Sequence, residues 1–136
     1  MRSVKFTGVS DAYIQRMSNR MAGRINRAYD AARLSTCRAK HGAILLQGSR
    51  VLAVGVNTNR NDPAYLEQRK PDKPSGISLH AEVAATRIHN DVPNTTLIVV
   101  RVMASGLLGD SKPCPECLDH IIFNTNIREV IYSEAG

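Results

Sequence analysis

The chain has 136 residues, 43% of them hydrophobic, and a formal net charge of +6 at pH 7. This length suits one domain with one core, which we expect to span residues 1–136, and the hydrophobic share excludes a disordered chain. No apolar run approaches the ~20 residues of a membrane helix, and no apolar stretch follows the first charges, so we expect no membrane association and no signal peptide.

The basic charge favours phosphate-bearing partners, either free nucleotides or nucleic acid, although scattered lysines and arginines also fit an ordinary basic surface. Aromatic residues make up only 4% of the chain and Trp is absent, so a base-stacking platform is not evident. The three cysteines are Cys37, Cys114 and Cys117. An odd number with one C-x-x-C pair argues against a disulfide scaffold and for a reducing compartment, so we expect a cytoplasmic protein.

The first predicted element is a helix that Ser10 caps and that runs to about Ser35. Its apolar residues recur at steps of three and four, as in an amphipathic helix: Ile14, Met17, Met21, Ile25, Ala28, Tyr29 and Ala32. The opposite face carries Arg16, Arg20, Arg24, Arg27 and Arg33. This face is either solvated or in contact with phosphates.

Residues 43–47 and 51–56 are rich in aliphatic and β-branched side chains, and Gly48-Ser49-Arg50 lies between them. This pattern predicts an antiparallel hairpin. Just before it, Cys37 and His41 have no partner at metal-ligand spacing, so we expect both to be structural and Cys37 to be buried.

Residues 57–79 are rich in Asn, Asp, Pro, Lys and Gly, which predicts a long loop. Loops of this length in a compact domain are usually functional or mobile, so we expect this one to shape a substrate entrance. Its basic residues Arg60, Arg69, Lys70 and Lys73 would attract a phosphate. A short helical turn around residues 64–68 is possible within it.

Helix and strand alternate in the rest of the chain. We expect a helix over 80–90, a buried strand over 96–103, a loop over 104–112, a helix over 114–125 and a strand over 129–133. Pro113 would take the first position of the second helix, whose inward face would carry Leu118, Ile121 and Ile122. The order α β β α β α β predicts an α/β fold, with helices on both sides of a mixed sheet of four strands.

Two short stretches carry the chemistry, namely His80-Ala81-Glu82 and Pro113-Cys114-Pro115-Glu116-Cys117. Together they have the form H-x-E…P-C-x-x-C. One imidazole and two thiolates make three protein ligands for Zn²⁺, and catalytic zinc sites leave the fourth position to water. The carboxylate two residues after the histidine suggests a general acid/base beside metal-activated water.

The predicted elements would bring these two stretches together. His80 and Glu82 would begin one helix, while Cys114 and Cys117 would begin another with both sulfurs on one face. If the two helices lie side by side on the same sheet face, their N-termini converge beyond the carboxyl ends of the strands, where open α/β sheets bind ligands. The partial positive charge of helix N-termini stabilises thiolates and therefore zinc binding.

On these residues the chain resembles the zinc-dependent cytidine and deoxycytidylate deaminase superfamily. The resemblance runs from Ser10 to Ser133 and rests mainly on the two motifs. Weaker matches are Gly42-Ala43-Ile44, Gly55-Val56-Asn57, and Ile127 with Val130-Ile131-Tyr132. It implies a deaminase-like three-layer α/β/α sandwich in which His80, Cys114 and Cys117 bind zinc and Glu82 shuttles protons. Asn57, and with it Ala81, would contact the substrate, although Asn57 also suits a turn at a strand end.

The resemblance implies hydrolytic deamination of a cytosine nucleoside or nucleotide, such as cytidine or dCMP, in a protein that we expect to be a homo-oligomer. A base deaminase acting on RNA or DNA and a non-catalytic zinc-bound interaction module remain alternatives. The superfamily also includes guanine, blasticidin and pterin deaminases. Most members continue past the fourth strand with a further helix and strand. The chain therefore looks C-terminally shortened, with a bare sheet edge or one that is blunted in another way.

Overall fold

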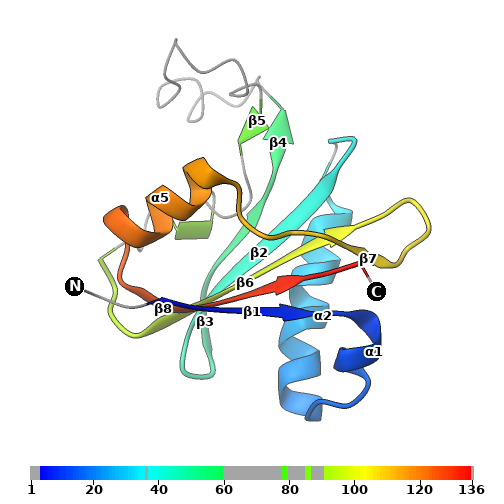
Figure 1. Ribbon diagram of the computed structural model, residues 1–136, viewed down its shortest axis with the longest axis horizontal. Helices are drawn as coiled ribbons and strands as arrows, with labels where there is room; N and C mark the ends of the chain where they lie inside the picture. Colours follow the sequence, from blue (N-terminus) through cyan, green and yellow to red (C-terminus); the bar gives the residue numbers. More distant parts are fainter. Residues whose placement is uncertain (1–3, 36, 60–77, 80–84, 87–90, 136) are drawn as a thin grey trace.

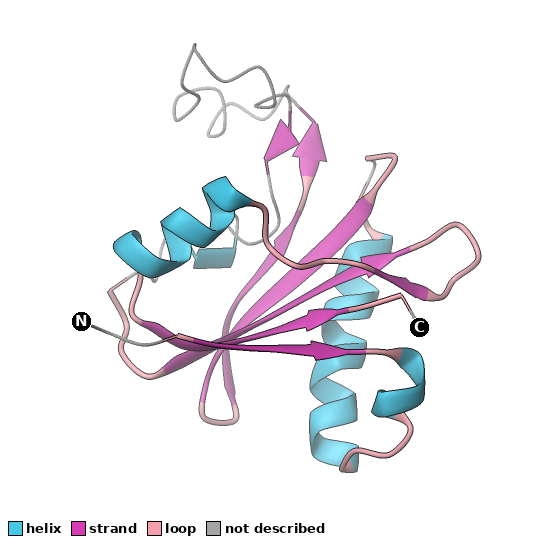
Figure 2. Cartoon of the chain, in the orientation of Figure 1, coloured by secondary structure: helices cyan, strands magenta, loops and turns pink. Residues whose placement is uncertain are grey.

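The structure, a computed structural model, describes residues 4–35, 37–59, 78–79, 85–86 and 91–135. A mixed sheet of six strands forms its centre: β1 (Lys5–Val9), β2 (Lys40–Gln47), β3 (Arg50–Val56), β6 (Thr95–Val102), β7 (Leu108–Gly109) and β8 (Ile127–Ser133). A separate pair consists of β4 (Thr58–Asn59) and β5 (Ser78–Leu79). The labelled helices are α1 (Asp11–Ile14), α2 (Asn19–Arg33) and α5 (Pro115–Asn124). Figure 2 shows these helices and strands in the orientation of Figure 1.

The strand order is β1-β8-β6-β2-β3, and β7 pairs with the end of β6. The predicted hairpin is confirmed, because β2 and β3 pair antiparallel through a turn in which Gly48 adopts a φ of +60°. Strands β6 and β8 are parallel, as expected for strands joined through a helix, whereas β2 runs antiparallel to β6.

Alternating side chains divide the core between the two faces of the sheet. On one face Ile44, Leu46, Ile98 and Val100 pack with the α2 residues Ile25, Ala28 and Ala32. On the other face Ala43, Leu45, Leu97 and Val99 pack with Ala85 and with Ile121 of α5. Because successive strand residues point to opposite faces, helices α2 and α5 cover opposite sides of the sheet, as Figure 1 shows. The helix-covered α/β arrangement is thus confirmed.

The expected sheet of four strands is wrong, and of the two alternatives for its edge, bare or blunted in another way, the structure shows the second. Strand β1 precedes the first helix and pairs in parallel with β8, from Lys5 opposite Glu129 to Val9 opposite Ser133. Its segment Lys-Phe-Thr-Gly-Val has a polar residue at one end and a glycine within it, and such short strands form through pairing rather than through their own propensity. The N-terminal segment therefore lies along the edge of β8 that the sequence pattern left open.

The helix expected from Ser10 to Ser35 is interrupted. Ser10 does cap α1, since its hydroxyl accepts a hydrogen bond from the Tyr13 N–H at 3.3 Å, but α1 ends at Ile14. Ser18 caps α2 in the same way through the Met21 N–H, also at 3.3 Å. A second serine with capping geometry restarts the helix, while the apolar stripe still faces the core across the break.

Two details near α5 also differ from expectation. Pro115 takes the first helical position with Cys114 as N-cap, so Pro113 lies outside the helix. Ile121 is buried, but Ile122 is exposed, because the inward stripe of α5 is narrower than three apolar residues suggest.

Residues 104–112 include a short strand, β7, which folds back on Arg101 and Val102 of β6. Among the described residues, no helix has the length and apolar character that crossing a bilayer requires.

Helix α2 approaches the sheet most closely at Gly42. A Cβ atom built there would lie 2.4 Å from both the Ala28 carbonyl oxygen and the Ala32 nitrogen, which are backbone atoms of α2. Backbone cannot rotate aside, so we expect Gly42→Ala to lower the free energy of unfolding by about 3 kcal/mol or more. Gly23→Ala is a matched control, because a Cβ at Gly23 meets nothing within 4 Å. We expect the free energy of unfolding of that variant, measured by urea unfolding, to increase by up to about 1 kcal/mol. Equal effects of the two variants would contradict the close approach.

Candidate functional site

The two motif cysteines lie together at the beginning of α5. Cys114 is the N-cap residue, with an extended backbone, and its carbonyl oxygen accepts the Leu118 N–H at 2.8 Å. Its side chain makes no capping hydrogen bond to the helix. Cys114 is half-buried and Cys117 is only 2% exposed. Neither forms a disulfide, and they lie three residues apart at a helix end that favours negative charge.

Two buried serines hold the segment that leads to Cys114. The Ser111 hydroxyl donates to the Val99 carbonyl oxygen at 2.8 Å. The Ser133 hydroxyl lies 2.9 Å from the Ser111 hydroxyl. The Ser133 hydroxyl also lies 2.7 Å from the Gly109 carbonyl oxygen and accepts the Arg101 N–H at 3.0 Å. The chain is thereby fixed to the ends of β6 and β8 shortly before α5 begins. These positioning residues were not predictable from the sequence, because an isolated serine carries no periodic signal.

A buried polar contact joins α5 to the segment that follows Glu82. The Thr86 hydroxyl lies 2.7 Å from Nε2 of His120 on α5, and Thr86 is fully buried. Ala85 packs in the same core cluster as Ile121. Residues 85–86 are helical, so the helix expected over residues 80–90 lies beside α5 in the part that the structure describes. No sequence motif pointed to Thr86 or His120.

Burial lowers the pKa of His120 below its ordinary value, because desolvation disfavours the charged ring. The unfolded chain therefore binds the proton more readily than the folded chain. The free energy of unfolding is therefore highest above the unfolded pKa near 6.5. It decreases as the pH falls through that value towards the lower folded pKa, because the unfolded chain takes up the proton first. We expect the free energy of unfolding to decrease more between pH 7.5 and 5.5 in the wild type than in His120→Gln, as measured by urea unfolding.

The wild type and His120→Gln share all other acid-sensitive groups, so the contributions of those groups cancel when the two pH profiles are compared. Thr86→Val is the second control, because it removes the hydrogen bond and keeps the titrating ring. It should lower stability by about 1 kcal/mol at neutral pH and retain the acid-dependent loss. Parallel pH profiles for the wild type and His120→Gln would show that this imidazole does not contribute.

Asn57 follows β3 and is 7% exposed. Its side-chain oxygen accepts hydrogen bonds from the Ser35 hydroxyl at 2.6 Å and from the His41 N–H at 3.0 Å. Its amide nitrogen donates to the Ala39 carbonyl oxygen at 2.7 Å. The side chain thus holds the segment between α2 and β2 against the end of β3, and one of its two amide N–H bonds is used in doing so.

Cys37 and His41, which we expected to be structural, both lie next to Asn57. Cys37 is half-buried rather than buried, and its thiol lies 3.6 Å from the Asn57 carbonyl oxygen. The His41 backbone exchanges hydrogen bonds with Asn57, since its carbonyl oxygen also accepts the Asn57 N–H at 3.2 Å. Both residues therefore belong to the segment that Asn57 orders.

We expect Asn57→Ala to lower the free energy of unfolding by about 2–4 kcal/mol, because the His41 N–H and the Ala39 carbonyl would lose their buried partner. Asn126→Ala is the matched control. Its amide makes one exposed hydrogen bond to the Asp91 carbonyl oxygen at 2.9 Å, so its loss should cost less than about 1 kcal/mol. Chemical denaturation of both proteins tests this, and similar costs would contradict a special role for Asn57.

His80, Ala81 and Glu82 lie outside the described residues, as do the basic loop residues at 60, 69, 70 and 73 and the helical turn expected at 64–68. The described residues include no group of three His, Cys, Asp or Glu side chains placed to hold a metal. Of the three expected zinc ligands, Cys114 and Cys117 are therefore those that the structure places.

The comparison with protein families decides the identity of the fold. The sequence model of the cytidine and deoxycytidylate deaminase zinc-binding region matches residues 18–134. The chain belongs to this family. A comparison with curated protein sequences gives no match.

Solved structures of deaminases share the fold. The dCMP deaminase of cyanophage S-TIM5 in its apo form has a TM-score of 0.62 at 21% identity, with 88% of this chain and 86% of that chain covered. A mutant cytidine deaminase of Mycobacterium tuberculosis has a TM-score of 0.51 at 19% identity, with 82% and 83% covered. Guanine deaminase of Bacillus subtilis has 0.53 at 20% identity, with 88% and 66% covered. At these identities the likeness concerns the fold.

Proposed function

We propose that this protein is a zinc-dependent hydrolase that deaminates a cytosine nucleoside or nucleotide to the uracil product with release of ammonia. The observation that carries the proposal is the C-x-x-C pair at the start of α5, which forms no disulfide, within a chain whose residues 18–134 match a zinc-binding deaminase family. The structure of the S-TIM5 dCMP deaminase in complex with dCMP and dUMP, at a TM-score of 0.60, supports a cytosine nucleotide as substrate.

The cysteines suit zinc by their chemistry and place. Thiolate sulfur is a preferred zinc ligand, and the half-buried Cys114 and buried Cys117 lie at a helix end where negative charge is stabilised. In this proposal Cys114 and Cys117 hold the ion together with His80. Zn²⁺, when bound, lowers the pKa of a coordinated water to roughly 7.

Glu82 carries the protons in the proposed reaction. Its carboxylate accepts a proton from the attacking water and passes it to the ring nitrogen N3 as the new C–O bond forms at C4. A second proton, from the new hydroxyl on C4, passes through Glu82 to the exocyclic nitrogen. The C4=O bond forms as the C4–N bond breaks, and ammonia leaves with the electron pair of that bond. Water and cytosine are thereby converted to uracil and ammonia, with the carboxylate regenerated.

The small β4–β5 sheet supports including Asn57 in the same site. Thr58 pairs with Leu79. Thr58 directly follows Asn57 in the sequence, and Leu79 directly precedes His80. The second amide N–H of Asn57 would then donate to the substrate while the first holds Ala39. We assign Ala81, between the proposed metal ligand and the proton carrier, to the wall of the substrate pocket.

Ammonia release tests this function. The purified, zinc-loaded protein is incubated with cytidine, CMP, dCMP, guanine and short cytosine-containing RNA and DNA oligonucleotides. We expect release from a free cytosine nucleoside or nucleotide. Release only from oligonucleotides would replace the proposal with a nucleic-acid base deaminase. Release only from guanine would change the substrate class, and no release from any compound would favour a non-catalytic zinc module.

A further inference from the structure

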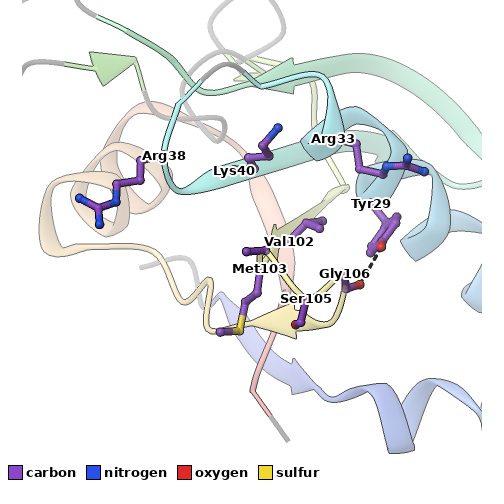
Figure 3. A pocket seen from close by; sticks show the side chains of 9 residues that line it. Tyr29, Arg33, Arg38, Lys40, Val102, Met103, Ser105 and Gly106 are labelled. Atoms are coloured by element: carbon purple, nitrogen blue, oxygen red, sulfur yellow. Dashed lines mark hydrogen bonds between the residues drawn. The ribbon is translucent and has the colours of Figure 1, made fainter.

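A cleft with a volume of about 600 Å³ lies between the end of α2, the beginning of β2 and the loop after β6. Figure 3 shows its lining, with Arg33 and Arg38 at opposite ends of the view and Lys40 between them. Tyr29, Met103 and Gly106 form part of the wall. The volume falls within the range of ordinary small-molecule sites.

The cleft belongs to the α2 face of the sheet, opposite the face that α5 covers. Lys40, Gly42 and Ile44 alternate along β2, and Ile44 packs in the core cluster of α2 while Gly42 touches the α2 backbone. Lys40 pairs in register with Val102, which belongs to that same cluster. The residues that line the cleft therefore lie on the α2 face of the sheet, and neither Cys114 nor Cys117 is among them.

The charged side chains that line the cleft are all positive among the residues that the structure describes. They are two guanidinium groups and one ammonium group. The ion pair that the described residues form, Lys5 with Glu129 at 4.0 Å, lies at the opposite end of the sheet. Three cations around one cleft produce a positive potential that favours an anionic ligand, and their spread along the cleft suits a ligand with more than one phosphate.

The walls of the cleft are held by hydrogen bonds within the protein. The Tyr29 hydroxyl donates to the Gly106 carbonyl oxygen at 2.6 Å, which ties α2 to the loop after β6. That loop is closed by the Met103 N–H to the Leu107 carbonyl oxygen at 2.9 Å. The Asn57 amide holds the Ala39 carbonyl between Arg38 and Lys40. A preformed site of this kind loses little conformational entropy when it binds a ligand.

We propose that this cleft is a phosphate-binding site, in which Arg33, Arg38 and Lys40 bind the phosphate groups of a nucleotide or of a single-stranded nucleic acid. Guanidinium groups bind phosphate oxygens bidentately, while the lysine ammonium supplies a point charge. The phenol of Tyr29 and the thioether of Met103 leave a less polar wall for the remainder of the ligand. This site goes beyond the proposed deaminase reaction, because it lies on the other face of the sheet.

Two probes without a removable amino group test the proposal on the full chain, namely sodium tripolyphosphate by calorimetry and fluorescein-labelled dT12 by anisotropy. The main variant combines Arg38→Gln with Lys40→Gln. It keeps Arg33, which also offsets the dipole at the end of α2. We expect tripolyphosphate to bind the variant about tenfold or more weakly at 50 mM salt. For dT12, the slope of log K against log salt should become shallower by about 1.4, or about 0.7 for each lost charge.

The matched control combines Arg50→Gln with Arg128→Gln, which removes the same charge at the opposite end of the sheet. It should leave the affinity for tripolyphosphate within about twofold of the wild type, since distant exposed charges are largely screened. Arg33→Gln alone should also weaken binding. Far-UV circular dichroism checks that each variant is folded.

The two probes distinguish the sources of phosphate. Binding of tripolyphosphate alone indicates free phosphate compounds, binding of dT12 alone indicates a polynucleotide backbone, and either supports the site if the main variant weakens it. The proposal is overturned if neither probe binds, or if the main variant binds both probes as the wild type does. None of these readouts depends on ammonia release, so a failure of the deaminase proposal remains distinguishable.

Discussion

The variant Glu82→Gln should lose most of its deaminase activity while it keeps the fold and one bound zinc ion per chain. The amide has nearly the same shape as the carboxylate, but it cannot accept a proton from water and return it to the base. General acid/base steps are typically worth ~10²–10⁴-fold in rate. Because one residue serves two transfers in the proposed reaction, we expect the loss of kcat to reach or exceed the upper end of that range.

Ammonia release, zinc content and substrate binding measured on the same preparation separate the possible roles of Glu82. The matched control is Glu134→Gln, an exposed position at the end of β8, which should retain the parent rate. Near-parental activity in Glu82→Gln with its zinc in place would refute the proton-transfer role. Loss of zinc from that variant would instead place Glu82 among the metal ligands.

The parts of the fold that the sequence predicted well are those with a regular apolar pattern. The stripe on the first helix, the hairpin around Gly48 and the aliphatic run of β6 all appear in the structure, because burial against one continuous sheet imposes these periods. Strand β1 was missed because its pairing with β8 involves residues more than 120 positions apart. Such a contact is decided by the sheet edge that is available rather than by local preference.

The candidate site was also predictable from the sequence only in part. The C-x-x-C pair was predictable because metal-ligand residues at a fixed helical spacing form a strong local signal, and the structure places both cysteines at the start of α5. The hydrogen bonds of Ser111, Ser133 and the Thr86–His120 pair were not predictable. Each depends on side chains from separate elements meeting inside the fold, and serine and threonine occur as often at exposed positions.

The three cysteines should differ sharply in their contribution to zinc binding. Cys114→Ser and Cys117→Ser would each remove one thiolate from the proposed site with three protein ligands. Loss of an outer-shell partner of a metal ligand already costs about 10–100-fold in affinity, so loss of a ligand itself should cost more than about 100-fold. We expect both variants to lose their zinc on dialysis against a weak chelator that leaves the wild type loaded, and to lose ammonia release with it.

Cys37→Ser is the matched control within the same chain. Cys37 also forms no disulfide and is half-buried, but it lies on the segment that Asn57 orders, before β2, and has no partner at metal-ligand spacing. Its substitution should leave one zinc per chain by metal analysis. If Cys37→Ser lost as much zinc as Cys117→Ser, Cys37 would be a zinc ligand and the proposed ligand set would be wrong. Full zinc retention in Cys114→Ser or Cys117→Ser would also refute that set. Because thiolates must be deprotonated to bind, the wild type should also release zinc more readily in acid.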